Sequence, residues 1–262
     1  MAVPASKISE LVHELLDQAN LVGEFRLHAM RRDITALYAK GDVDEFTYHH
    51  VLNAILSRLG DWDRSLGHAL KAIALRNDAN ALNNAAVAYL RVDPPHPEEA
   101  ARLLVEATGL PDGNALSILA NLAEAFAGMG AWTQARETLA EAFAIADLDN
   151  VEHLYRLSDA SGAIGQYERS VELFARFLAR RKGVEAPADP LPFIDGCPDS
   201  WWVGLHVPKA IEGAVARVRA LREPAAAYVD RVDIDASASA LAVLEEMRPY
   251  RARANKSALP DG

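Results

Sequence analysis

One short segment of the chain combines residue types that could support nucleophilic catalysis. Cys197 is flanked by Asp195 and Asp199, and His206 follows further along the chain. A thiolate nucleophile needs an adjacent base to take its proton and a carboxylate to orient that base. A Cys-His-Asp enzyme is therefore one hypothesis. No family signature accompanies the cysteine, however, and the fold would have to bring these partners together.

Two adjacent tryptophans in the same segment favour a structural interpretation. Trp201 and Trp202 lie in the stretch 184–208, which is so rich in proline and glycine that we expect it to be irregular and without helix. Large aromatic side chains anchor such segments onto a folded neighbour. We therefore expect a non-catalytic role, although Pro187 to Trp202 could also fold over a binding surface as a lid.

The other candidate side chains do not predict a metal or nucleic-acid site. His49 and His50 are adjacent, so on a helix they point about 100° apart and cannot chelate a metal as an i, i+4 pair would. We expect neither a metal nor a cofactor. The net charge of -10 argues against nucleic acid or an anionic membrane as the partner, because phosphate binding needs clustered cations.

The composition is typical of a folded chain in a reducing compartment. Half of the 262 residues are hydrophobic and 24% are charged. The single cysteine cannot form an internal disulfide. Residues 1–20 include Glu10, Glu14 and Asp17, unlike the apolar core of a signal peptide, and no window has the roughly 18 apolar residues of a membrane span. We expect a cytoplasmic protein.

A repeat of 35 residues organises the middle of the chain. Its columns are Gly60, Gly130 and Gly165; Trp62, Trp132 and Tyr167; and Ser65, Ala100, Ala135 and Ser170. Repeats of this length are typical of stacked two-helix units, which bury their apolar faces against each other. The glycines suit tight turns at positive φ, and the small residues suit close helix crossings.

One unit in particular resembles the tetratricopeptide (TPR) pattern. The matching residues are Leu122, Ala123, Phe126, Gly130, Trp132, Ala135, Leu139 and Ala142. The resemblance implies an all-α fold, a right-handed αα-superhelix of about four units. Its expected parts are a TPR-like domain at 1–183, with a degenerate capping hairpin at 6–44 and units at 45–80, 81–115, 116–150 and 151–183; the irregular segment 184–208; further helices at 209–253; and a disordered tail at 254–262. The second unit departs most, because Val92 to Pro97 replaces its glycine turn.

The resemblance also implies a concave groove lined by the first helix of each unit. The candidate groove residues are His50, Arg58, Leu82, Tyr89, Asn121, Glu124, Glu152, Tyr155 and Asp159, with Trp201 and Trp202 as a lid. Tyrosines offer rigid contact area and carboxylates select a basic partner. Taken singly, Glu124, Glu152 and Asp159 could equally be solvated surface charges.

The groove does not suit the TPR subclass that holds a C-terminal carboxylate. Asn121 and Arg156 fall where two residues of that clamp would lie, but Ala85, Tyr89 and Glu152 occupy the other places. Acidic side chains would repel a terminal carboxylate. The sequence therefore favours a non-catalytic adaptor that binds a basic or amphipathic peptide or helix of another protein. The alternatives are a regulatory subunit occluded by its own proline-rich segment, and the Cys197 enzyme.

Overall fold

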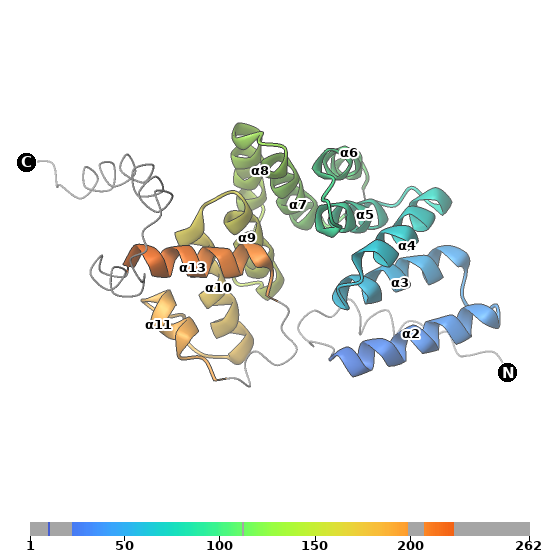
Figure 1. The fold of residues 1–262 in the computed structure, drawn as a ribbon, viewed down its shortest axis with the longest axis horizontal. Coiled ribbons are helices and arrows are strands. Elements are labelled where there is room, and N and C mark those ends of the chain that lie inside the picture. Colours follow the sequence, from blue (N-terminus) through green and yellow to red (C-terminus); the bar gives the residue numbers. More distant parts are fainter. Residues whose placement is uncertain (1–9, 11–22, 112, 199–206, 223–262) are drawn as a thin grey trace, which may run out of the picture. The chain divides into compact units, whose positions relative to one another are not determined.

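The computed structural model describes Glu10 and residues 23–111, 113–198 and 207–222. All regular secondary structure in these residues is helical, as the sequence predicts. The helices are α2 (Glu24–Ala39), α3 (Glu45–Arg58), α4 (Trp62–Leu75), α5 (Ala79–Arg91), α6 (Pro97–Thr108), α7 (Ala115–Gly128), α8 (Trp132–Ala144), α9 (Val151–Ala163), α10 (Tyr167–Lys182), α11 (Pro190–Asp195) and α13 (Lys209–Arg222). Figure 1 shows them following one another along the chain.

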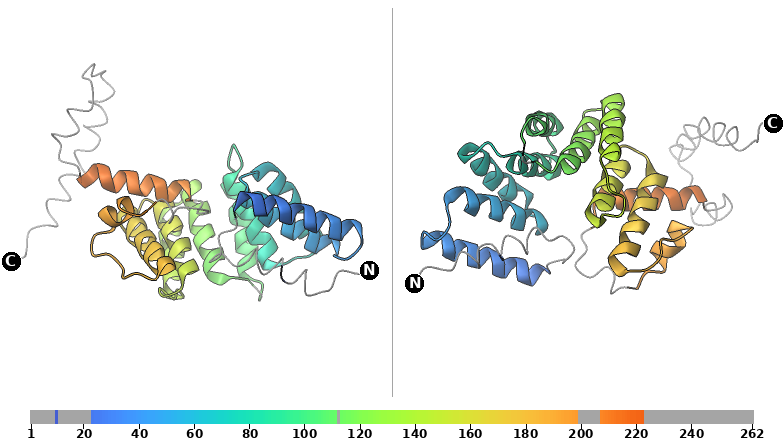
Figure 2. Two further views of the ribbon diagram at one scale, coloured as in Figure 1. Left: turned by 90° about the horizontal axis from the view of Figure 1, so that it is seen from below. Right: turned by 180° about the vertical axis from the view of Figure 1, so that it is seen from behind.

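Helices α3 to α10 form four successive pairs. Each pair consists of a first helix (α3, α5, α7 or α9) and the second helix that follows it (α4, α6, α8 or α10). Adjacent pairs also pack, with α4 against α5, α6 against α7, and α7 against α9, and Figure 2 shows this succession from two further sides. The helix pairs coincide with the 35-residue repeat, while the right-handed superhelix stays a prediction.

Each first helix begins at a side chain that caps its free backbone N–H groups. The capping residues are Asp44, Asp78, Asn114 and Asn150, whose side-chain oxygens accept from backbone N–H groups of the first turn. Such a cap is worth about 1 kcal/mol relative to alanine. These four positions therefore fix where the first helices start.

The turns within the pairs use glycine as the sequence predicts. Gly60, Gly130 and Gly165 have φ of 73°, 74° and 80°, a region that other residues rarely adopt. The second pair has no such glycine. Its α6 begins at Pro97 instead, where the missing N–H costs nothing because the first turn has no intrahelical acceptor for it.

The column of small residues marks the contact between the two helices of each pair. Ser65, Ala100, Ala135 and Ser170 are all 0% exposed. In the fourth pair, the Ser158 hydroxyl donates to the Ser170 carbonyl at 2.7 Å, and the Ser170 hydroxyl donates to the Ser158 carbonyl at 2.8 Å. In the first pair, Asn53 and Ser65 form an equivalent polar contact, with Asn53 Nδ2 donating to Ser65 Oγ at 2.8 Å. Close crossings are thus filled either by alanine or by reciprocally bonded polar residues.

The prediction that 184–208 contains no helix is wrong, because α11 lies within it. The Asp189 side chain accepts from the Leu191 N–H at 3.4 Å, and Pro190 and Pro192 occupy the first turn, where proline removes no helical hydrogen bond. Leu191 and Ile194 are buried, and the principal contact of α11 is with α10. Counting prolines without regard to their positions produced the error.

Helix α13 covers the C-terminal end of α9. It buries Ile211, Ala214 and Val218, and it approaches Gly162 so closely that a Cβ there would lie 2.7 Å from the Ala210 carbonyl oxygen. The chain divides into two compact parts, of which the first ends at Val218. Of the second part the structure describes only residues 219–222, the last turn of α13.

Several predicted features lie outside the described residues. These are the first helix of the capping hairpin, Trp201, Trp202, His206, the helix expected after 222 and the tail 254–262. Helix α2 (Glu24–Ala39) lies within the range 6–44 that was predicted to form the capping hairpin. Within the described part of the chain, no helix has both the length and the apolar character needed to cross a membrane.

Candidate functional site

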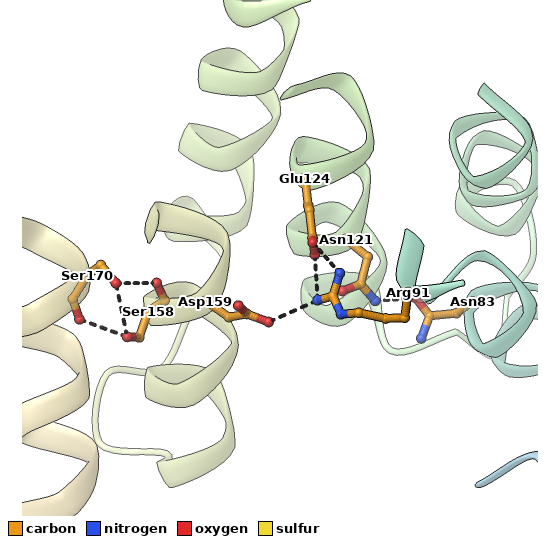
Figure 3. A network of polar contacts seen from close by, with 7 residues as sticks. All are labelled: Asn83, Arg91, Asn121, Glu124, Ser158, Asp159 and Ser170. Carbon is orange, nitrogen blue, oxygen red and sulfur yellow. Dashed lines mark hydrogen bonds and ion pairs between the residues drawn. The ribbon is translucent and has the colours of Figure 1, made fainter. Parts of the chain in front are cut away.

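Two carboxylates from neighbouring first helices share one guanidinium. Glu124 on α7 and Asp159 on α9 occupy the same column of the repeat, one unit apart. Arg91, in the last turn of α5, points between them (Figure 3). Its Nη1 and Nη2 both donate to Glu124, with Nη2 to Oε2 at 3.0 Å, and Nη2 also lies 3.4 Å from Asp159 Oδ2. We call these three residues the Arg91 network.

The Arg91 network is largely removed from solvent. The side chains of Arg91, Glu124 and Asp159 are 27%, 16% and 13% exposed, so the two acids are not the solvated surface charges that each could have been if taken singly. Oδ1 of Asp159 is buried and has no hydrogen-bond partner among the residues that the structure describes. Desolvating a carboxylate is costly unless its charge and its lone pairs are both compensated. The network therefore has one carboxylate oxygen whose desolvation nothing offsets.

The pKa values of the network follow from this incomplete compensation. Burial, reinforced by the nearby charge of Glu124, raises the pKa of Asp159 to about 7, while Arg91 and Arg156 oppose the rise. Burial alone would lower the pKa of Arg91, but the carboxylates of Glu124 and Asp159 raise it above its ordinary value. Arg91 is thus always charged, and Asp159 takes up a proton at a higher pH than an ordinary carboxyl group does.

Neutral polar groups flank the network. On one side, Asn121 Nδ2 donates to Asn83 Oδ1 at 2.8 Å, which links α7 to α5 (Figure 3). Burial and the Asp159 charge also raise the pKa of Tyr155 to about 12, so its hydroxyl keeps its proton. These groups add hydrogen-bonding capacity beside the network without adding charge.

Other predicted groove residues do not belong to the Arg91 network. Tyr89 is half-buried on α5 and contacts His96, with ring centroids 5.9 Å apart. Glu152 forms an i, i+4 ion pair with Arg156 on α9 at 3.7 Å. Leu82 is only 2% exposed and belongs to the apolar core, so it offers no surface to a partner.

The two predicted residues on α3 differ in their surroundings. His50 stacks on Phe46 at 5.5 Å, and burial lowers the pKa of its imidazole. Arg58 is near enough to Tyr155 for its charge to lower the pKa of that phenol. Of the nine candidates, Glu124 and Asp159 are the pair that the structure joins in one network.

Sequence reasoning missed the central member of the network. Arg91 falls in the repeat column that holds Leu56 in the first unit and Phe126 in the third. A cation in a column that is otherwise filled by large apolar residues is unusual, because a buried charge needs a partner. That departure from the column pattern was the available signal.

The surroundings of Cys197 are not those of an activated thiol. The Cys197 thiol donates to the Phe193 carbonyl at 3.1 Å, and burial raises its pKa, whereas a nucleophilic cysteine needs a lowered one. Its proposed base, His206, lies outside the described residues. Within the residues that the structure describes, no three His, Cys, Asp or Glu side chains are placed to hold a metal ion.

Comparison with models of known protein families finds no match, and comparison with curated proteins finds none either.

Proposed function

We propose that this chain is a TPR-like, non-catalytic interaction protein that binds a segment of another protein along its first helices, at the Arg91 network. The observation that carries the proposal is the incomplete compensation of the Arg91 network: no group in the described part of the chain donates to Oδ1 of Asp159. A helical array held together only by packing would gain stability from an apolar residue at this position. Uncompensated polar groups concentrate at functional sites, where a ligand completes them.

The location of the network supports a protein ligand rather than a small molecule. The three residues come from α5, α7 and α9, one helix from each of three successive units. A ligand that contacts all three helices has to extend along the array, as a peptide or helix does. Tyr155 on α9, whose pKa responds to the charges of Asp159 and Arg91, adds aromatic contact area near the charged groups.

The charge of the network indicates a basic or amphipathic partner. Two carboxylates and one guanidinium leave one negative charge when Asp159 is ionised. A cationic side chain would be attracted to this site, whereas an acidic segment would be repelled. The single cysteine is a free thiol, which agrees with the cytoplasmic location that we also propose.

Site-specific crosslinking in an extract of the native host tests the proposal. A photoreactive phenylalanine analogue replaces Tyr89 on α5 in one variant and Glu137, an exposed residue of α8, in a matched control. We expect a discrete crosslinked partner from position 89 and none from position 137. In the Tyr89 variant, replacing Glu124 and Asp159 together by lysine should abolish the crosslink.

Two outcomes would contradict the proposal. One is equal crosslinking from both positions, and the other is a crosslink that survives charge reversal in a chain with unchanged circular dichroism. Because Asp159 is buried, its replacement by lysine could unfold the protein. In that event the comparison of positions 89 and 137 decides alone.

A further inference from the structure

We infer that the cavity between the C-terminal end of α9 and helix α13 binds a small organic anion that carries more than one negative charge. The cavity has a volume of about 450 Å³, which lies within the range of small-molecule sites. None of its lining residues belongs to the Arg91 network, so this inference goes beyond the proposed function and does not depend on it.

The lining of the cavity combines small residues with three polar side chains. Five of the eight lining residues are glycine or alanine, and the others are Tyr167, Lys209 and Arg217. A mostly apolar wall with a few polar groups is typical of sites for small molecules. A cavity left by packing alone is apolar, whereas this one has two cations in its lining.

The charge of the cavity is opposite to that of the chain. Acidic residues outnumber lysine and arginine by 37 to 27 in the whole sequence, yet the lining includes two cations and no acid. Among the residues that the structure describes, neither Lys209 nor Arg217 is paired with a carboxylate. Glu168 and Glu212, in the first turns of α10 and α13, do not line the cavity. Two cations without counterions attract an anionic ligand.

Two helix N-termini add to this positive potential. Tyr167 is the first residue of α10, and Lys209 is the first residue of α13. The backbone N–H groups at the start of a helix carry a partial positive charge, which favours phosphate and carboxylate groups. The Tyr167 hydroxyl supplies a further hydrogen-bond donor. The backbone and the side chains thus favour the same kind of ligand.

The spacing of the two cations indicates how the ligand has to be charged. Lys209 and Arg217 are eight residues apart on α13, about 12 Å along the helix axis, and Gly213 lies midway between them on the same face. A Cβ at Gly213 would meet nothing within 4 Å, so the space beside it is open. A ligand that lies over Gly213 and reaches both cations needs more than one negative group.

Titration calorimetry of the full chain with three probes tests the inference. The probes are adenosine diphosphate, which carries phosphate groups; citrate, which carries carboxylates; and adenosine, which is uncharged. We expect adenosine diphosphate, citrate or both to bind with a Kd below about 1 mM, and adenosine not to bind. The comparison of the two anions identifies which oxyanion the site takes.

Three variants and a control connect the binding to the cavity. Lys209→Gln and Arg217→Gln should each weaken binding of the anion about tenfold, because each removes one charged hydrogen bond. Gly213→Leu should abolish binding by filling the cavity, while α13 stays intact because leucine favours a helix more than glycine does. Arg136→Gln, which removes an exposed cation of α8, should bind as the wild type does.

Four results would overturn the inference. The first two are no binding of either anion up to about 1 mM, and equal binding of adenosine. The third is unchanged binding by Gly213→Leu. The fourth is an equal loss for Arg136→Gln and for the two cavity cations, which would indicate attraction to surface charge in general. The wild-type titrations need no variant, so they decide even if a variant fails to fold.

Discussion

Replacing Asp159 by asparagine should change how the stability of the protein depends on pH. Folding raises the pKa of this carboxyl from 3.8 to about 7, so between these values the folded state keeps a proton that the unfolded state has lost. Stability therefore falls as pH rises through this window, the reverse of an ordinary salt-bridged carboxylate. Asparagine keeps the shape of the side chain and does not titrate.

The size of this stability change follows from the linkage between proton binding and folding. At about 1.4 kcal/mol for each pH unit, the full change in the pKa of Asp159 corresponds to about 4 kcal/mol of unfolding free energy. Relative to Asp159→Asn, the wild type should lose about 1.4 kcal/mol per pH unit between roughly pH 4.5 and 6.5 and little more above pH 8. The difference between the two proteins isolates Asp159 from the other titrating groups.

Urea unfolding followed by circular dichroism at several pH values measures this difference. Glu137→Gln serves as the control and should differ from the wild type by less than about 0.5 kcal/mol at each pH, because the residue is exposed. The reasoning would be refuted if the wild type gained stability relative to Asp159→Asn as pH rose. That result would mean that Arg91 stabilises an ionised Asp159 in the folded state.

Three further sets of substitutions test the packing of the helices, each by urea unfolding. Ala135→Trp should cost several kcal/mol, because the residue is fully buried where α7 and α8 cross, and a change below about 1 kcal/mol would refute that placement. Gly162→Ala should destabilise the protein by about 1–3 kcal/mol through its clash with α13, whereas Gly213→Ala, where a Cβ meets nothing within 4 Å, should be neutral or stabilising. Ser158→Ala or Ser170→Ala alone should cost about 1–3 kcal/mol, because each leaves a buried hydrogen-bonding group without its partner. The double variant should cost less than the sum of the two, since buried alanines fill the equivalent crossings in other pairs. Strictly additive costs would contradict the reciprocal hydrogen bonding.

The helix pairs could be predicted because their signals are local and repeated. A glycine such as Gly130 marks a turn that needs positive φ, and a small residue such as Ala135 marks a crossing that excludes larger side chains. Each signal recurs at one spacing, so errors in single units do not accumulate. The position of a proline matters more for predicting a helix than how many prolines a segment contains. Pro190, the first residue of α11, is compatible with a helix because it lies at the helix start.

The Arg91 network could be predicted only in part, because it depends on distances across units. The common column of Glu124 and Asp159 suggested that they lie on neighbouring helices, and they do. Nothing in the column pattern indicated that Arg91, 68 residues before Asp159, would reach both acids. Side-chain reach and burial are properties of the assembled helices, which a repeat pattern does not contain.

The contact between Arg91 and Asp159 also bears on how the protein unfolds. In a chain of units that touch only their immediate neighbours, the last unit can open without affecting the second one. Here the contact joins the second unit to the fourth, so the opening of α9 removes one of the partners that holds the end of α5. We therefore expect the three units from α5 to α10 to open together, so that their backbone amides exchange with solvent as one block rather than unit by unit.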